Sequence, residues 1–171
     1  MTRMTSREKV VHIRRNVENF GDPYLRDMKP EEAAVCQECR CVYAGGRWQL
    51  ESQAANHLKK AKNVVTTVCP ACRKTHDRMP GGVVTLAGQF VQAHREEILN
   101  LLHNESERAR TVNPLERIMD IEQEDSGLVV LTTNEKMAQR IGRAMQRAYD
   151  GDVQYKWSRD TKLIRVNWRR D

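Results

Sequence analysis

Two pairs of cysteines, each pair separated by two residues, constrain this 171-residue chain more than any other feature. They are Cys36 with Cys39 and Cys69 with Cys72, and Cys69 follows Cys39 by thirty positions. A two-residue insert lets the backbone turn so that both thiolates face one cation, and two such knuckles complete a tetrahedron of sulfur ligands. The spacing therefore predicts one structural Zn²⁺ held by these four cysteines, in a closed site that leaves no ligand position for water.

Other uses of the cysteines explain the pattern less well. A disulfide framework fits neither the odd count of five nor the lack of an export signal. A thioredoxin-like redox motif needs one pair beside a βαβ pattern, and an iron–sulfur cluster stays open, although two widely separated knuckles favour zinc. Cys41 is either a substitute ligand or a small, partly buried thiol, and the second interpretation is favoured. His76 is the nearest competing ligand and is expected at the surface or beside the ligands.

The distribution of charge indicates what kind of partner the chain binds. The net charge is +6, and residues 40–83 and 134–171 form two basic blocks around an acidic middle. Such blocks attract polyanions by releasing counterions from phosphates, although solubility alone also explains a basic composition. No apolar run approaches the roughly 20 residues that span a bilayer, and the basic N-terminus lacks the apolar segment of a secretory signal. We therefore expect a cytoplasmic location.

The chain is predicted to be an α+β protein with four segments. Residues 1–30 read as a basic arm that stays mobile until it meets a partner, and residues 31–83 form a zinc ribbon. The ribbon is expected to contain a hairpin around Gly45 and Gly46, a helix over 52–62 and a strand over 63–68. Residues 84–112 are expected to form a long amphipathic helix, and residues 113–171 a small domain with the order β-β-α-β-β.

The helix prediction rests on apolar residues at helical spacing between 85 and 110, namely Leu86, Phe90, Ala93, Ile98, Leu101 and Leu102. At about 1.5 Å per residue, such a helix would hold the ribbon and the C-terminal domain about 35–40 Å apart. In the C-terminal domain, Asn134 is expected to cap a helix that runs from Glu135 to about Tyr149.

Basic side chains in the zinc ribbon and in the C-terminal domain are candidate contacts to nucleic acid. Four of them lie on one face of the helix after Asn134, where like charges at these spacings cost about 0.2–0.5 kcal/mol per pair. Trp48 either stacks on bases or fills the core of the ribbon. The candidates are Arg47, Trp48, Lys59, Lys60, Lys62, Arg73 and Lys74 in the ribbon, and Lys136, Arg140, Arg143, Arg147 and Arg165 in the C-terminal domain.

A set of short motifs spread over nearly the whole chain adds a resemblance. The motifs are DPY (22–24), Y-x-x-G-R-W (43–48), CPAC (69–72), P-G-G (80–82), L-x-G-x-F (86–90), NPLERI (113–118), TT (132–133) and A-x-R-I-G (138–142). Together the chain resembles a family of small, uncharacterised proteobacterial zinc-ribbon proteins. More distantly, it is similar to the zinc-bearing N-terminal region of the archaeal and eukaryotic export adaptor of the large ribosomal subunit, of the nonsense-mediated-decay type.

The resemblance implies a zinc-dependent fold, with the ligands at the four paired cysteines, and association with ribosomal RNA or ribosomal subunits. The family pattern has glycine after the second cysteine of each knuckle, where this chain has Arg40 and Arg73. That departure changes the charge beside the metal.

These observations predict a non-enzymatic, zinc-containing RNA-binding protein that associates with the ribosome, with ribosomal proteins as further partners. The alternative is a zinc-scaffolded adaptor for protein interactions or a transcription-associated regulator. An enzyme is disfavoured because the sequence has no nucleophile–base pair and no phosphate-binding glycine-rich loop. The acidic residues Asp120, Glu122, Glu124 and Asp125 straddle a predicted turn, where they are expected to solubilise it.

Overall fold

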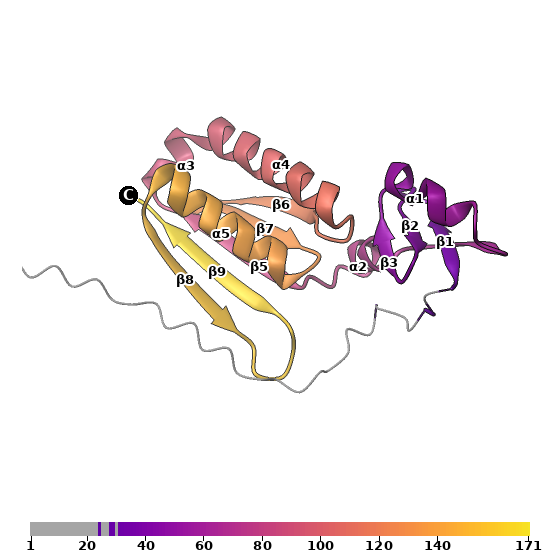
Figure 1. The fold of residues 1–171 in the computed structure, drawn as a ribbon. Coiled ribbons are helices and arrows are strands. Elements are labelled where there is room, and N and C mark those ends of the chain that lie inside the picture. Colours follow the sequence, from indigo (N-terminus) through magenta and orange to yellow (C-terminus); the bar gives the residue numbers. More distant parts are fainter. Residues whose placement is uncertain (1–23, 25–27, 30) are drawn as a thin grey trace, which may run out of the picture.

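The computed structural model of this protein describes residues 24, 28–29 and 31–171 (Figure 1). Over these residues it is an α+β fold with two mixed sheets and five helices, which confirms the predicted class. The arm expected over residues 1–30 lies almost entirely outside the described residues.

The first sheet belongs to the part of the chain that carries the cysteines, called here the cysteine unit (residues 33–79). Its strands lie in the order β3-β2-β1-β4, and β4 runs parallel to β1 while the other pairs are antiparallel. The β2–β3 hairpin turns at Gly45 and Gly46, both at positive φ, which the tight turn requires and which confirms the predicted hairpin. The elements are β1 (Ala33–Cys36), β2 (Val42–Ala44), β3 (Arg47–Gln49), α1 (Glu51–Leu58), β4 (Val64–Thr67) and α2 (Pro70–His76).

The long helix predicted over 84–112 is wrong in its first part. Residues Gly82–Ala87 form strand β5, and the helical region consists of α3 (Gln89–Ala93) and α4 (Arg95–Val112). Within β5, Gly82, Val84 and Leu86 are buried in alternation, so the apolar residues there follow a strand period and not a helical one. The helix is therefore no spacer, because α4 packs on the same domain as β5.

The second sheet has five strands and β5 at its centre. The order is β6-β7-β5-β9-β8, and β5 pairs antiparallel with β7 and parallel with β9. The order β-β-α-β-β expected after residue 113 is present, and β5 and α4 complete it into what is called here the sheet domain (residues 81–171). Its remaining elements are β6 (Ile118–Glu124), β7 (Gly127–Thr132), α5 (Glu135–Tyr149), β8 (Asp152–Trp157) and β9 (Ile164–Arg169).

The core of the sheet domain lies between the sheet and two helices on one of its faces. Figure 1 shows α4 and α5 side by side over the strands. In β9, Ile164, Val166 and Trp168 are buried under the helices, whereas the alternate residues of this strand are exposed on the other face. Helix α5 approaches the sheet closely at Gly142, where a Cβ atom would stand 2.8 Å from the hydroxyl of Tyr155. Asn134 caps α5 by accepting from the amide of Met137, as predicted.

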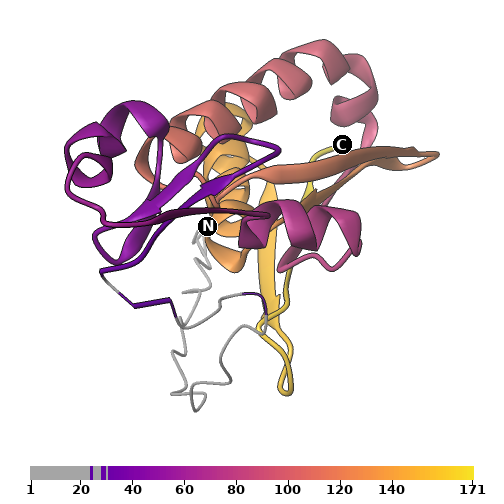
Figure 2. The same ribbon diagram turned by 90° about the vertical axis from the view of Figure 1, so that its right-hand side faces the viewer.

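The cysteine unit lies against the end of the sheet domain where α4 ends and β6 begins (Figure 2). Gln53 of α1 donates to the carbonyl of Thr111 at 3.0 Å. Arg78 forms ion pairs with Asp120 and Glu122 of β6, at 3.4 and 3.0 Å. The two units are thus joined by polar contacts from several elements.

Candidate metal centre and basic surfaces

The four paired cysteines converge in the structure. Their Sγ atoms all lie within 4.8 Å of one another, with Cys36 and Cys72 3.9 Å apart and Cys39 and Cys69 3.6 Å apart. A tetrahedral site with metal–sulfur bonds of about 2.3 Å has sulfur–sulfur edges of about 3.8 Å. The spacing of the sulfurs therefore fits a metal ion bound by all four thiolates.

Backbone geometry explains how each knuckle presents its sulfurs. In the first knuckle, the amide of Arg40 donates to the carbonyl of Cys36, and Arg40 itself has a φ of 63°. This left-handed conformation favours glycine, so a glycine would be less strained than Arg40 at this position. Arg73, by contrast, lies inside helix α2, where a glycine would have no conformational advantage. In the second knuckle, the amide of Cys72 donates to the sulfur of Cys69, the residue that caps α2.

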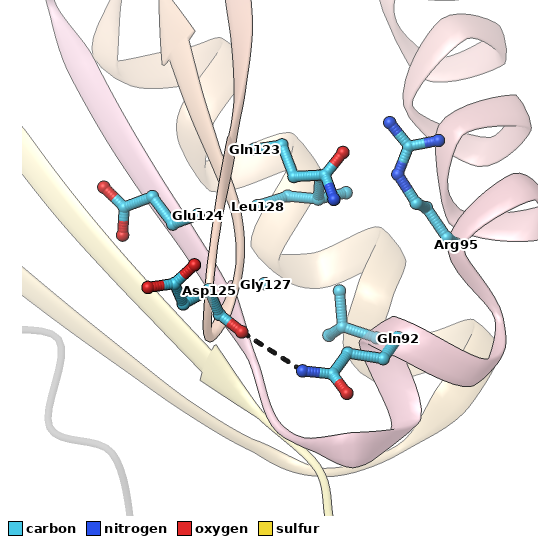
Figure 3. A pocket seen from close by; sticks show the side chains of 8 residues that line it. Gln92, Arg95, Gln123, Glu124, Asp125, Gly127 and Leu128 are labelled. Atoms are coloured by element: carbon cyan, nitrogen blue, oxygen red, sulfur yellow. Dashed lines mark hydrogen bonds between the residues drawn. The ribbon is translucent and has the colours of Figure 1, made fainter.

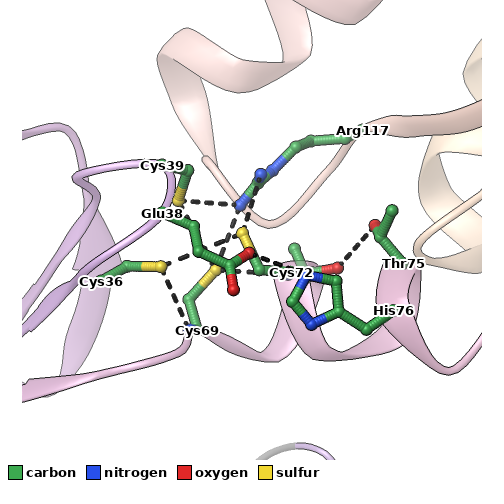
Figure 4. A network of polar contacts seen from close by, with 9 residues as sticks. Cys36, Glu38, Cys39, Cys69, Cys72, Thr75, His76 and Arg117 are labelled. Carbon is green, nitrogen blue, oxygen red and sulfur yellow. Dashed lines mark hydrogen bonds and ion pairs between the residues drawn. The ribbon is translucent and has the colours of Figure 1, made fainter.

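An arginine from the sheet domain completes the cluster. The guanidinium of Arg117, just before β6, donates to the sulfurs of Cys39, Cys69 and Cys72 at 3.3, 3.2 and 3.5 Å (Figure 4). Burial opposes its charge, but the neighbouring thiolates raise the pKa of Arg117 above its usual range, so it is positively charged. Leu115 packs against the same cysteines.

Cys41 is buried beside the four paired cysteines. Its sulfur lies 3.2 Å from that of Cys39. The hydrogen bond to Cys41, followed by that to Cys69, lowers the pKa of Cys39 far below its usual range, and the pairing with Cys39 raises the pKa of Cys41. Cys41 is thus a neighbour of the cluster, and the group of side chains that could hold a metal ion consists of the four paired cysteines. His76 is exposed and pairs with Glu38 at 3.1 Å, so it lies outside the four-sulfur group.

Basic residues from both units meet at one pocket. Lys74 of α2, Lys136 of α5 and Lys162 of the β8–β9 loop line a pocket of about 360 Å³. Pro70 and Ala71, which lie between the two cysteines of the second knuckle, form part of its wall. The Nζ atom of Lys74 donates to the carbonyl of Thr133 at 3.1 Å, directly before the cap of α5. Lys74 and Lys136, which the sequence analysis assigned to two separate surfaces, are therefore neighbours.

Two other candidate arginines have internal partners. Arg140 forms an ion pair with Glu105 of α4, whose side chain is only 7% exposed, at 3.5 Å. Arg73 donates to the carbonyl of Tyr24 and stands over the ring of the same residue. Both side chains therefore help to hold the fold together, which weakens their assignment as contacts to a ligand.

The remaining candidates are spread over the surface. Arg143 and Arg147 are exposed on α5, and Arg165 is exposed on the face of the sheet opposite the helices. Arg47, Lys59, Lys60 and Lys62 are exposed on the cysteine unit. Trp48 is half-buried against the cysteine cluster and makes an edge contact with Tyr43, as expected of a core residue of this unit.

A second pocket, of about 370 Å³, lies between α3 and the β6–β7 turn (Figure 3). Glu124 and Asp125 of the predicted acidic cluster line it, opposite Arg95, and Gln92 donates to the carbonyl of Asp125 at 3.1 Å. The other two acids of the cluster pair with Arg78. The cluster is thus divided between an ion-pair network and a pocket wall.

Sequence reasoning found the four cysteines and counted Lys162 among the basic residues near the last strand, but it missed Arg117. Arg117 is one of only four basic residues between 84 and 133, and its isolation in an acidic stretch was the available signal.

Among the described residues, no helix is both long and apolar enough to cross a membrane. The chain matches no protein-family model, no curated protein and no solved structure.

Proposed function

We propose that this protein is a zinc-containing RNA-binding protein of the cytoplasm that acts on ribosomal RNA or a ribosomal subunit. Two parts of the proposal have separate support. The metal part rests on the four-cysteine cluster, and the RNA part rests on the lysine-lined pocket beside it.

Zinc is the metal that suits the cluster best. Four thiolates at tetrahedral spacing are the usual ligand set of structural Zn²⁺, which has no redox chemistry of its own and no preference for another geometry. A site with four protein ligands has no open position for water, so it would stabilise the fold and perform no catalysis. This is the basis for proposing a binding protein and not an enzyme.

The convergence of Lys74, Lys136 and Lys162 on one pocket is the observation that carries RNA binding. The three ammonium groups come from three different elements, and Glu135 is the one acid among the lining residues. A lysine contacts phosphate as a point charge and releases counterions from the nucleic acid. Arg143 and Arg147, exposed on the helix that begins at the pocket, would extend the positive surface along the RNA backbone.

Fluorescence anisotropy with a labelled single-stranded RNA, repeated over a range of salt concentrations, tests the RNA part. The slope of log affinity against log salt is negative, and each lost phosphate contact makes it shallower by about 0.7 for a single strand. The slope of the variant Lys136→Ala/Lys162→Ala should therefore be shallower by about 1.4. The control Lys59→Ala/Lys60→Ala removes the same charge from the end of α1 and should change the slope less.

Equal losses in the two variants would mean that binding follows net charge and would remove the pocket from the proposal. If the unmodified protein shows no salt-dependent binding to RNA, the function itself fails. Sedimentation of lysate through sucrose gradients at low and high salt then identifies the particle. Co-migration with a ribosomal subunit that high salt releases is the expected result.

One observation favours the alternative of a protein-interaction adaptor. Strand β4 is an edge strand of the first sheet, and its Val64 and Val65 are 48% and 55% exposed. An exposed sheet edge can accept a strand from a partner chain. Capture of a protein that persists at high salt, together with absent RNA binding, would favour this function.

A further inference from the structure

Arg117 is held from both sides of the junction between the two units. Its amide donates to the hydroxyl of Thr133 at 2.9 Å, and its Nε atom donates to the carbonyl of Pro114 at 2.6 Å, so its backbone and the base of its guanidinium belong to the sheet domain. Its two terminal nitrogens donate to cysteine sulfurs of both knuckles. All three nitrogens of the guanidinium are therefore engaged.

When the four cysteines hold a metal ion, the negative charge of the buried centre needs a positive group beside it. Four thiolates around a divalent cation carry a net charge of −2, and Cys36, Cys69 and Cys72 are buried. A buried charge is stable only when it is paired and hydrogen-bonded. The planar fork of an arginine supplies one positive charge and several directed donors at once, which a lysine cannot do.

From this geometry we propose that Arg117 is the charge-compensating residue of the metal centre, and that metal occupancy thereby controls the docking of the cysteine unit on the sheet domain. The proposal rests on the metal part of the proposed function and not on RNA binding. The cation would hold the sulfurs of Cys39, Cys69 and Cys72 close together, where the guanidinium of Arg117 can donate to all three. The pairing of β1 with β4 already brings Cys36 close to the second knuckle, and the cation adds the bonds that fix Cys39 beside Cys69 and Cys72.

Of the other contacts across the junction, the one between Lys74 and the carbonyl of Thr133 is also partly buried, but it involves no cysteine sulfur. Arg78 pairs with Asp120 and Glu122 at exposed positions, where ion pairs contribute little. Gln53 reaches Thr111 at an exposed position as well. The contact of Arg117 with the sulfurs is therefore the part of the interface that metal loss would affect most.

Metal affinity, measured by competition with a chromogenic chelator, is the first readout. Loss of a residue that hydrogen-bonds metal ligands typically weakens binding 10–100-fold. We expect a loss in this range for Arg117→Met and a smaller one for Arg117→Lys, which keeps the charge but not the fork. The control Arg110→Met removes one arginine from the last turn of α4 and should bind metal as the unmodified protein does.

Limited trypsin digestion is the second readout, because Arg78 lies at the exposed link between α2 and β5. Chelation of the metal from the unmodified protein should accelerate cleavage after Arg78, as followed by mass spectrometry. Metal-loaded Arg117→Met should be cleaved faster than the metal-loaded unmodified protein.

Two results would overturn the proposal. One is a metal affinity within two-fold of the unmodified protein in both Arg117 variants. The other is an unchanged rate of cleavage after Arg78 when the unmodified protein loses its metal, a measurement that stands even if Arg117→Met fails to fold. A purified protein that binds no metal would instead refute the metal part of the proposed function, and absent RNA binding would leave this proposal intact.

Discussion

Replacing Arg140 by alanine should destabilise the fold and leave RNA affinity unchanged, although the sequence suggested this residue as a phosphate contact. Arg140 lies on α5 and pairs with Glu105 of α4, so the ion pair joins the two helices that cover the sheet. The substitution leaves the carboxylate of Glu105 with Arg108, whose side chain is 72% exposed. Because that second pair is mostly solvated, it compensates little for the loss.

The size of the effect follows from the burial of the two partners. Removing one partner of a fully buried pair costs about 3–5 kcal/mol. Glu105 is 7% exposed but Arg140 is 33% exposed, so solvent screening reduces the expected loss to about 2 kcal/mol. For a chain of this length, that loss lowers the melting temperature by about 4–8 °C.

Thermal unfolding of the metal-loaded protein, followed by circular dichroism, measures the stability, and anisotropy at a temperature where all variants are folded measures RNA affinity. The matched control is Arg147→Ala, which removes an exposed arginine from the same helix and should change stability by less than about 0.5 kcal/mol while weakening RNA binding. In Glu105→Leu/Arg140→Met, an apolar contact replaces the pair, and stability should return toward that of the unmodified protein. An Arg140→Ala protein with normal stability and weak RNA binding would refute the structural assignment of Arg140.

Four further substitutions test the cysteine cluster, the first knuckle and the contact of α5 with the sheet. Cys41→Ser should retain one bound metal ion per chain, whereas Cys69→Ser should lose it, as measured by atomic emission; equal losses would make Cys41 a ligand. Arg40→Gly should stabilise the metal-loaded protein by about 0.5–1 kcal/mol in urea denaturation, since φ at this position is positive, and a destabilised variant would contradict this. Gly142→Val should destabilise it by about 1–3 kcal/mol, because the added carbons meet Tyr155 and Val166; wild-type stability would show that α5 can move away.

The central strand shows where local pattern fails. Leu86 and Phe90 lie at helical spacing, but Val84 and Leu86 also lie at strand spacing, so the sequence supports both periods. Partners that are distant in sequence decide the outcome: β5 pairs with β7 and, in parallel, with β9, whose first residue Ile164 lies opposite Gly82. The hairpin at Gly45 and Gly46 and the cap at Asn134 were predictable because each is determined by residues within four positions of one another.

The candidate site shows the same limit. The ligands follow from spacing, because the chemistry of each knuckle lies within four residues. Arg117 is 45 positions from the nearest ligand, Cys72, and no spacing rule covers a residue that contacts ligands without being one. The grouping of Lys74 with Lys136 and Lys162 likewise depends on docking of the two units, since the segments that carry them are far apart in the chain.

The position of the pocket links the two parts of the proposed function. Its wall includes Pro70 and Ala71 of the second knuckle, whereas Lys136 and Lys162 belong to the sheet domain, so the pocket exists only while the two units are docked. If Arg117 makes docking depend on the metal, metal loss will weaken RNA binding even though no lysine changes its charge. A mechanism based on net charge requires the opposite: the loaded centre carries a charge of −2, and four thiols that take up protons when the metal leaves carry none, so metal loss would make the protein more positive and strengthen RNA binding. A variant that already lacks Lys136 and Lys162 will then respond less to a chelator than the unmodified protein, and this non-additivity separates an effect of geometry from an effect of charge.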